Sequence, residues 1–464
     1  MGYTGTIIHK GGRTMSKQSG IRNMTEGSPA GHLIAFSLPL LAGSFLQQFY
    51  NMVDSAVVGN FVGDSALAAV GIGWPVVFMF SSLFMGLSNG GTVVIAQFFG
   101  AGNPHRVRDA VDTIYTAFLY AAIPITLLAV GLVYPLMVVL RVDSAAWTDT
   151  FTYLIVVCAG IIGTIGYNLN AGILGGLGNS RTTLLFLSVA TVMNIVLDLL
   201  FVAVFRWGVF GAALATIISQ ASSWLFGLFY INRHYPDFAI RPFCRRFDKK
   251  LFRQIMSIGL PAGLQMSLVA IGSMAVLSKI NSYGQAYTAA YNAGSKIDSL
   301  VFLPIQSLST AITAFVGQNI GAKRLDRARQ GIRFTVVCAL VWSVVCLAVI
   351  PIGPYLIALF SDTPEVMAIG GEYLACILPG YLVFSVMFSL NNAMRGAGDS
   401  MFALIDVVLS LILVRVPMVY IFANRFGPDY MFYGITIGWA VGCLLSVLYY
   451  FSGIWKRKGS LADK

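Results

Sequence analysis

The chain has 464 residues, of which 57% are hydrophobic and 11% are charged, and its formal net charge is +11. A soluble protein of this length needs more charge to cover its surface and breaks its apolar runs more often, so this composition excludes a soluble fold. The positive charge lies between long apolar runs rather than on a polar surface, and we therefore expect no nucleic-acid partner.

The first segment, residues 1–29, is polar, basic and rich in glycine. It lacks the apolar core and the small-residue cleavage site of a secretory signal. We therefore expect a disordered cytoplasmic tail, within which Met15 and Met24 are alternative starts.

Twelve apolar stretches of membrane-spanning length follow the tail. Lipid cannot satisfy free backbone amides, and the alternating pattern of a membrane β-barrel is absent from these runs, so all twelve should be α-helices. The predicted spans are 32–57, 66–98, 110–139, 148–178, 183–205, 208–232, 253–280, 286–318, 332–358, 366–396, 402–424 and 431–454.

The second six spans repeat the first six at a shift of about 220 residues. The matching segments are Leu38–Pro39 with Leu260–Pro261, Gln97–Ala101 with Gln318–Ala322, and Gly176–Ser180 with Gly396–Ser400. Six spans is an even number, so both copies keep one orientation and should be related by a pseudo-two-fold axis along the membrane normal. The predicted fold is all-α and polytopic, with six-helix lobes at 30–232 and 253–455 and a basic linker at 233–252.

Most of the 30 Lys and Arg residues fall in alternate loops. They lie in the first tail, in the linker, in a cluster after the eighth span, in a basic tail at 456–464, and at isolated loop positions that include Arg395. Basic loops mark the cytoplasmic side of a membrane protein. We therefore predict a multi-pass protein of the plasma membrane, the inner membrane of a bacterial cell, with both termini in the cytoplasm.

Few charged residues lie inside the spans. Asp54 lies late in the first span, and Asp198 lies in the fifth, four residues after Asn194. A carboxylate in a membrane costs about 3 kcal/mol on insertion scales, so it is retained for structural pairing or for use. Asn194 and Asp198 share a helix face and offer oxygen atoms that suit a proton or a sodium ion.

Other sources of chemistry are lacking in the sequence. The six cysteines show no paired or CxxC spacing, and the four histidines fall in tails, in loops or at span ends. There is also no GxxxxGK[ST] loop, so ATP hydrolysis within the chain is excluded as the energy source. We expect a transporter rather than an enzyme, with no cofactor other than a coupling ion.

Five elements together resemble the multidrug and toxic compound extrusion (MATE) family in its bacterial branches, over nearly the whole chain. They are Asp54–Gly59 with Leu67–Val70 behind it, the motifs at Gln97 and Gln318, Asn194-x-x-x-Asp198, and Gly211–Thr216. The resemblance implies a cation site in the first lobe formed by Asp54, Asn194, Asp198 and Thr216, with Asn170 as a weaker member. A sodium ion would be held there by the two carboxylates.

The second lobe departs from the family's sodium-coupled branch, which has acidic residues in spans 7 and 10. Gln265 stands in span 7, and Phe384 and Ser385 stand in the middle of span 10. A cation site at those positions is therefore not expected. The polar residues of this lobe that are candidates for a substrate cavity are Gln265, Lys296, Asp298, Asp406 and Arg415, although pairing among the charged ones is favoured over substrate contact.

The predicted function is secondary active export of organic, amphipathic and cationic small molecules by antiport with H⁺ or Na⁺. Two carboxylates that lie close together in a medium of low dielectric constant resist carrying two charges, so a proton or a cation should neutralise them. The alternative is a flippase for lipid-linked sugars, although only Lys296 and Arg415 could hold pyrophosphate. We expect a monomer in the bilayer; the natural substrate and the choice of ion stay open.

Overall fold

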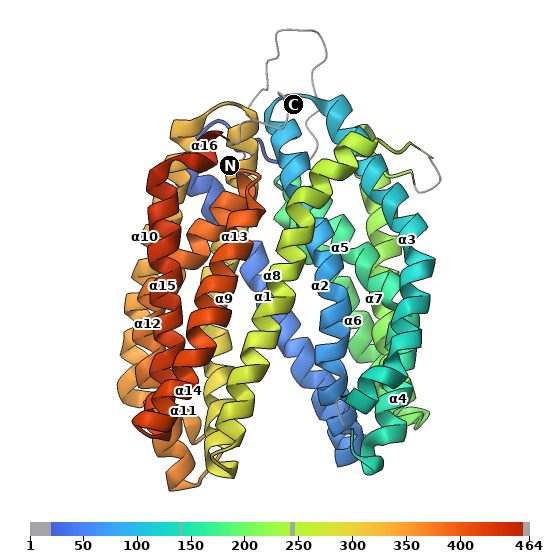
Figure 1. Cartoon of the computed structure of the whole chain (residues 1–464). Helices are drawn as coiled ribbons and strands as arrows, with labels where there is room; N and C mark the ends of the chain where they lie inside the picture. The colour runs from blue at the N-terminus through green and yellow to red at the C-terminus, as the bar shows by residue number, and fades with distance from the viewer. Residues whose placement is uncertain (1–19, 140–141, 242–245, 458–464) are drawn as a thin grey trace.

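The computed structural model describes residues 20–139, 142–241 and 246–457, which form long helices joined by short connections (Figure 1). Among these residues, eleven helices are long and apolar enough to cross a membrane, and one bent pair of helices makes a twelfth span. The predicted all-helical fold with twelve spans is confirmed. Most of the two predicted tails lies outside the described residues.

The first six spans form lobe 1. They are α1 (Pro29–Phe61), α2 (Asp64–Gly100), α3 (Pro104–Val139), α4 (Ser144–Ala159) with α5 (Ile161–Gly176), α6 (Ser180–Asp198) with the π-helix η1 (Leu199–Val204), and α7 (Gly208–His234). A short 3-10 helix, η2 (Pro236–Phe238), follows them.

The second six spans form lobe 2. They are α8 (Lys249–Asn281), α9 (Gln285–Gly321), α10 (Leu325–Cys346) with η3 (Leu347–Ile352) and α11 (Gly353–Ile357), α12 (Pro364–Gly396), α13 (Ser400–Val407) with the π-helix η4 (Val408–Arg415) and α14 (Val416–Arg425), and α15 (Met431–Ser452). The short helices η5 (Pro428–Tyr430) and α16 (Ile454–Arg457) flank α15.

The fourth span is not the single helix that the apolar run predicts. It bends by 49° between α4 and α5, at Gly160. A side chain at Gly160 would collide with Ile217 of α7, so the bend lies where two helices approach each other closely. Apolar run length cannot reveal such a bend, because both halves are equally hydrophobic.

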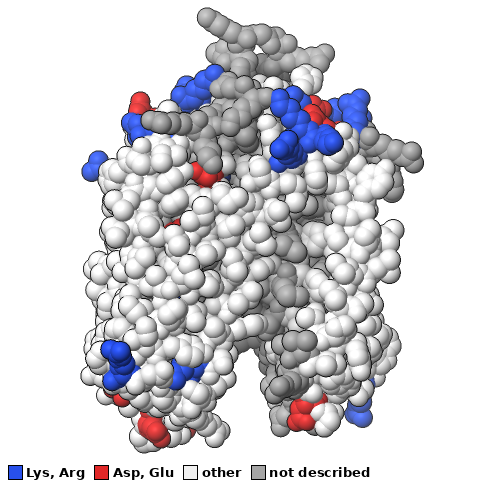
Figure 2. Space-filling model, viewed as in Figure 1, with Lys and Arg blue, Asp and Glu red and all other residues white. Residues whose placement is uncertain are grey.

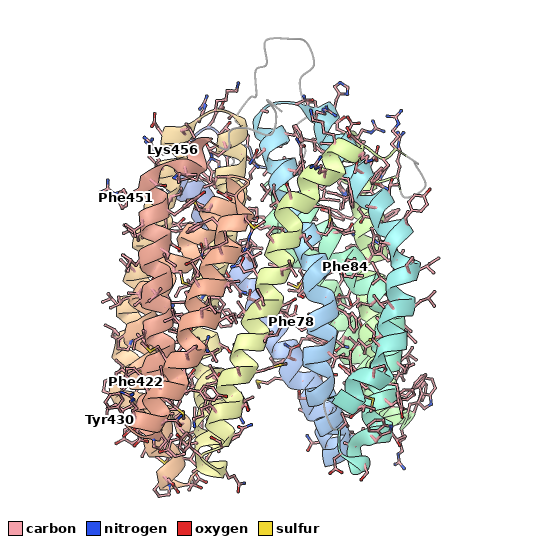
Figure 3. The ribbon with its side chains drawn as sticks, viewed as in Figure 1. Phe78, Phe84, Phe422, Tyr430, Phe451 and Lys456 are labelled. Carbon is pink, nitrogen blue, oxygen red and sulfur yellow. The ribbon has the colours of Figure 1, made fainter. Side chains whose placement is uncertain are left out.

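Each lobe has a hydrophobic core, which in lobe 1 extends to the start of α8, and the outer surface of the protein is apolar. Phe118 and Phe186 are buried in lobe 1, and Tyr373 and Phe432 are buried in lobe 2. Phe422 and Tyr430 lie near one end of lobe 2 and Phe451 lies near the other (Figure 3). Tyr430 is 51% exposed and Phe451 is 78% exposed, as expected for side chains that face lipid or its interface.

The lobes meet where α2 packs against α8. Gly86 and Gly90 of α2 lie against Gly259 and Gly263 of α8, and a Cβ atom on any of the first three would collide with backbone atoms of the other helix. Small residues spaced four apart allow helix backbones to touch in a membrane. Two such pairs therefore set the close approach of the two lobes.

Two glutamines tie the lobes together at the end of the molecule where α1 begins and α2 ends, which we call the terminal face. Gln97 of lobe 1 donates from Nε2 to the carbonyl oxygen of Gly396 at 3.1 Å, and Gln318 of lobe 2 donates to that of Gly176, also at 3.1 Å. Both glutamines are fully buried. We call these reciprocal contacts the glutamine latch; they lie at the repeated motifs found in the sequence.

The segment before α1 lies across the same end. The Arg22 backbone N–H donates to the Leu177 carbonyl of lobe 1 at 3.3 Å. The Met24 backbone N–H donates to Gln318 Oε1 at 2.8 Å, and the Arg324 guanidinium of lobe 2 donates to the Thr25 carbonyl at 2.7 Å. This segment therefore adds contacts between the lobes to those of the glutamine latch.

The two ends of the molecule differ in charge and in shape. Figure 2 shows most of the visible Lys and Arg side chains at the terminal face and a notch between the lobes at the opposite face. Within the described residues, the lobes are thus in contact at the basic end and apart at the other.

Candidate functional site

The centre of the candidate site in lobe 1 is a pair of carboxylates. Asp54 lies on α1 and is 9% exposed, and Asp198 ends α6 and is fully buried. Counting helical rise places each about 10 Å from the opposite face, where the lobes are apart. The two carboxylates interact with each other electrostatically, so the structure brings together the two acidic residues that the sequence singles out.

The polar atoms of this pair lack the partners that buried groups normally have. Oδ1 of Asp54 and both carboxylate oxygens of Asp198 are buried, and among the described residues they have no hydrogen-bond partner other than the carboxyl group of each other. Oδ1 and Nδ2 of Asn194, one helical turn before Asp198, are buried and have no partner among these residues. Buried polar atoms in proteins are nearly always paired, so this set of unpaired atoms fits a site that binds a small ligand such as an ion or a proton.

Two tyrosines, which the sequence analysis did not single out, complete the surroundings of the pair. Tyr50 lies on α1 one turn before Asp54, interacts with both carboxylates and forms a hydrogen bond with Thr216 of α7. Tyr153 of α4 interacts with both carboxylates as well. The i, i+4 spacing from Asp54 could have revealed Tyr50, whereas Tyr153 comes from another helix and gives no local signal.

The π-helix η1 begins directly after Asp198. Such a segment breaks the regular ladder of backbone hydrogen bonds and is frequent at functional sites. The Thr216 hydroxyl donates to the Ala212 carbonyl at 3.1 Å, within its own helix. Thr216 thus reaches the pair through Tyr50, while its own hydroxyl hydrogen is used locally.

Asn170 lies apart from the pair. Its Oδ1 accepts a hydrogen bond from the Tyr115 hydroxyl, and its Nδ2 donates to the Trp224 carbonyl at 3.0 Å. It lies six residues from the end of α5 at the terminal face, which puts it roughly 20 Å from Asp198 along the helices. Both ends of its amide are therefore occupied far from the carboxylates.

The five candidate residues of lobe 2 do not converge on one site. Asp298 accepts a hydrogen bond from the Tyr381 hydroxyl at 2.7 Å and interacts electrostatically with Arg415. Lys296 lies over the ring of Phe360 at 5.0 Å. Gln265 and Asp406 each have a separate set of partners.

Gln265 contacts a buried cationic side chain, that of Arg395. Its Oε1 accepts a hydrogen bond from the Arg395 guanidinium at 2.6 Å, and Arg395 is only 8% exposed. In the sequence, Arg395 groups with the loop charges because it stands next to the predicted end of a span. The structure instead directs its long side chain back into lobe 2, where it also contacts Asn392 at 3.2 Å.

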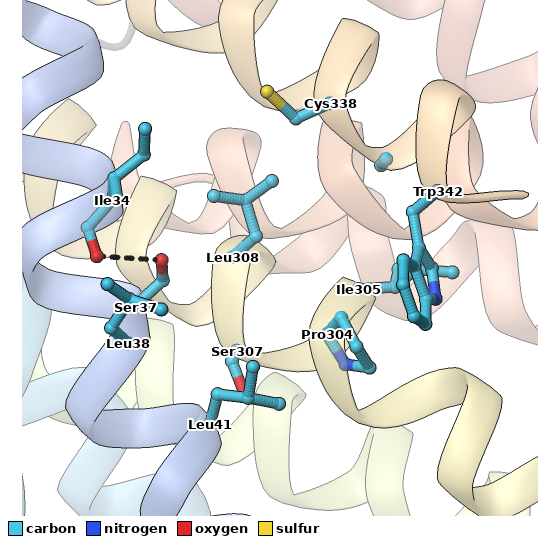
Figure 4. Close-up of a pocket in the computed structure, with 11 residues that line it drawn as sticks. Ile34, Ser37, Leu38, Leu41, Pro304, Ile305, Ser307, Leu308, Cys338 and Trp342 are labelled. Atoms are coloured by element: carbon cyan, nitrogen blue, oxygen red, sulfur yellow. Dashed lines mark hydrogen bonds between the residues drawn. The ribbon is translucent and has the colours of Figure 1, made fainter. Parts of the chain in front are cut away.

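An apolar pocket lies between the lobes, nearer the terminal face. It has a volume of about 220 Å³ and is bounded by α1 on one side and by α9 and α10 on the other (Figure 4). Leu38, Pro304 and Trp342 are among its walls, and no charged residue lines it. It is therefore distinct from the carboxylate pair, which lies farther along α1.

Within the residues that the structure describes, no three or more His, Cys, Asp or Glu side chains group as ligands for a metal ion. The carboxylate pair could hold a proton or a single monovalent cation, with the oxygen of Asn194 as a further ligand.

Comparisons with known proteins agree on one family. The MatE family matches residues 39–200 and 261–421, once in each lobe. A protein of Bacillus subtilis (strain 168) named Probable multidrug resistance protein YpnP is 32% identical over 446 residues, which is 95% of this chain and 99% of the relative. Probable multidrug resistance protein NorM of Thermotoga maritima is 25% identical, and the match covers 92% of this chain and 94% of that relative.

A solved structure has the same fold. It is described as the outward-facing conformation of a multidrug resistance MATE family transporter of the MOP superfamily. The match covers 95% of this chain and 99% of the chain in that structure, with a TM-score of 0.87 and 23% sequence identity. The arrangement of two six-helix lobes is thus that of a known transporter fold.

Proposed function

The chain belongs to the MatE family of multidrug efflux transporters, and we propose that it exports organic compounds by antiport with an inward-moving proton or sodium ion. The family is one of transporters rather than enzymes. The relatives named as multidrug resistance proteins support drug-like substrates, and they do not favour the lipid-linked sugar flippase as an alternative.

The single observation that carries the proposal is the carboxylate pair with its unpaired atoms. Asp54, Asp198 and Asn194 together hold five buried polar atoms that, within the described residues, have no hydrogen-bond partner outside the carboxylate pair itself. Leaving such atoms unpaired costs roughly 1–3 kcal/mol each, and a charged carboxylate costs more. A proton or a sodium ion at the pair removes this penalty, so binding of the ion stabilises lobe 1 in the conformation that holds it.

The arrangement of the lobes supports alternating access. The notch at the opposite face leads toward the level of the pair, while the glutamine latch and the Gly-rich contact of α2 with α8 hold the terminal face together. We assign the opposite face to the outside, because the basic face marks the cytoplasm. The ion then binds from outside, and its loading favours release of substrate to the same side before the lobes rock to face inward.

The moving units are the two lobes, residues 30–232 and 253–455, with the basic linker 233–252 at the cytoplasmic side. One charge that crosses 100 mV supplies about 2.3 kcal/mol, which is enough for a roughly fifty-fold concentration ratio of an uncharged substrate. Exchange of one ion for one monovalent organic cation is electroneutral, so it is driven by the chemical gradient of the ion. We place the protein in the plasma membrane with both termini in the cytoplasm, acting as a monomer on cationic and amphipathic small molecules.

The proposal is tested by efflux of ethidium from cells that lack their own pumps. Proton and sodium gradients are imposed separately on cells with the wild type, with Asp54→Asn, or with Asp109→Asn as a matched control at a half-exposed carboxylate. We expect efflux that follows one gradient, is lost in Asp54→Asn and is kept in Asp109→Asn. Efflux that persists unchanged in a well-expressed Asp54→Asn variant would contradict the role of the pair.

A further inference from the structure

Lobe 2 contains a buried carboxylate that the proposed mechanism does not use. Asp406 lies on α13, six residues from the start of this helix at the terminal face, and is 1% exposed. Helical rise places it about 9 Å from that face and far from the notch. It is therefore not part of the lobe 1 pair.

The two oxygens of Asp406 are in different situations. Oδ2 accepts hydrogen bonds from Asn391 Nδ2 of α12 at 2.6 Å and from the Ser446 hydroxyl of α15 at 3.0 Å. Oδ1 is buried and has no hydrogen-bond partner among the described residues. One oxygen is thus held in place from two helices while the other is unpartnered.

No positive charge balances this carboxylate in the described part of the chain. The helix α13 packs against α8, α12, α15 and η4. From these helices, Asn391 and Ser446 form hydrogen bonds with the Asp406 carboxylate, and the Cys443 thiol of α15 is the titratable group that interacts with it electrostatically. Hydrogen bonds to an ionised group stabilise its charge, but they do not offset the full cost of burying an isolated charge in the membrane. The charged form is therefore only partly compensated.

We propose that Asp406 is a proton-binding site of lobe 2, with the proton on Oδ1 and with Asn391 and Ser446 holding Oδ2. A proton removes the charge without breaking either hydrogen bond. A metal ion fits less well, because it needs several oxygen ligands and Asn391 turns a donor nitrogen toward the carboxylate. The role of this proton as a further coupling ion rests on the proposed function, whereas its binding does not.

A second pair of polar groups lies between Asp406 and the terminal face. The Tyr449 hydroxyl, three residues after Ser446 on α15, donates to the Asp399 carboxylate at the start of α13. Asp399 caps that helix, and the Phe402 ring stacks on Tyr449 at 3.8 Å between ring centroids. Carboxylates and hydroxyls thus follow one another along α13 and α15, and we assign proton exchange to this side.

The test is labelling of the purified full-length protein with dicyclohexylcarbodiimide, which forms a stable adduct with protonated carboxyl groups in apolar surroundings. Mass spectrometry of peptides locates the adducts over a series of pH values. We expect an adduct at Asp406 that grows as the pH falls, is unaffected when sodium chloride replaces choline chloride, and is absent in Asp406→Asn. No adduct at Asp406 over a range in which other span carboxylates react would overturn the proposal, and so would suppression by sodium at constant pH.

Ser446→Ala provides a second variant that keeps the carboxylate. It removes one donor to the charged form, so labelling should extend to higher pH by about one unit. An unchanged profile would overturn the part assigned to Ser446. Labelling needs no transport, so the two proposals can fail separately. An adduct at Asp406 in a protein without ion-driven efflux would refute the antiport and support the proton site. Ion-driven efflux without an adduct at Asp406 would support the antiport and refute the proton site.

Discussion

Replacement of Gln318 by leucine should weaken the closure of the terminal face. The Gln318 side chain is fully buried, donates to the Gly176 carbonyl at 3.1 Å and accepts from the Met24 backbone N–H at 2.8 Å. Gln318→Leu keeps most of the volume but leaves both backbone groups unpaired while the face is closed; once it opens, water can reach them.

The size of the effect follows from these two hydrogen bonds. Each has a net value of about 1 kcal/mol, so their loss should shift the equilibrium between closed and open forms by about 2 kcal/mol, or roughly thirty-fold. Gln97→Leu removes the hydrogen bond to the Gly396 carbonyl and should shift the same equilibrium by at least about five-fold.

The assay is the distance distribution between two spin labels on the purified protein. His105→Cys in lobe 1 and Asp326→Cys in lobe 2 place the labels at exposed positions on the terminal face, on a background without native cysteines. The fraction of long distances should rise in Gln318→Leu and stay at the wild-type value in Gln306→Leu, an exposed glutamine on the same helix. A Gln318→Leu protein that is folded and keeps the wild-type distribution would refute the latch.

Three further outcomes are expected. Gly90→Leu should keep α2 away from α8 and abolish efflux of ethidium while the protein still reaches the membrane, because a side chain there would collide with backbone atoms of α8; full efflux would contradict this close contact. Asn194→Leu should lose gradient-driven efflux, whereas Asn170→Leu should keep its ion dependence and lose only thermal stability; the reverse pattern would place the ion site at Asn170. Asp248→Ala should lower stability in detergent by about 1 kcal/mol at neutral pH, because Asp248 caps α8. The pKa of Asp248 is lowered by the Leu251 backbone N–H, and also by the Lys250 backbone N–H and the Arg106 guanidinium. The stabilising effect of Asp248 is therefore full above about pH 5 and is lost as the pH falls below about 4. A difference in melting temperature between wild type and Asp248→Ala that is independent of pH would contradict this cause.

The spans could be predicted because a membrane imposes a length and a composition on each of them. Every predicted span overlaps one helix or two or three consecutive helices, although most helices run past the predicted ends. The bend at Gly160 and the π-helices after Asp198 and before Val416 could not be predicted, since they depend on how neighbouring helices pack.

Part of the candidate site could likewise be predicted from the sequence, and part could not. Asp54 and Asp198 could be singled out because carboxylates in spans are rare, and the structure brings them together. Tyr153 could not, because an aromatic residue in a span is usually packing and only the fold brings it near the pair. The burial of Arg395 could not be predicted for another reason. Its backbone lies next to a loop, while its flexible side chain extends into lobe 2.

The most direct test of antiport uses the purified protein in liposomes with a substrate gradient and no imposed ion gradient. Ethidium moving down its gradient should drive protons or sodium ions in the opposite direction, recorded with a pH-sensitive or sodium-sensitive dye inside the liposomes. We predict such countermovement for the wild type and for Asp109→Asn, and none for Asp54→Asn. Ethidium flux in the wild type without movement of either ion would contradict the account.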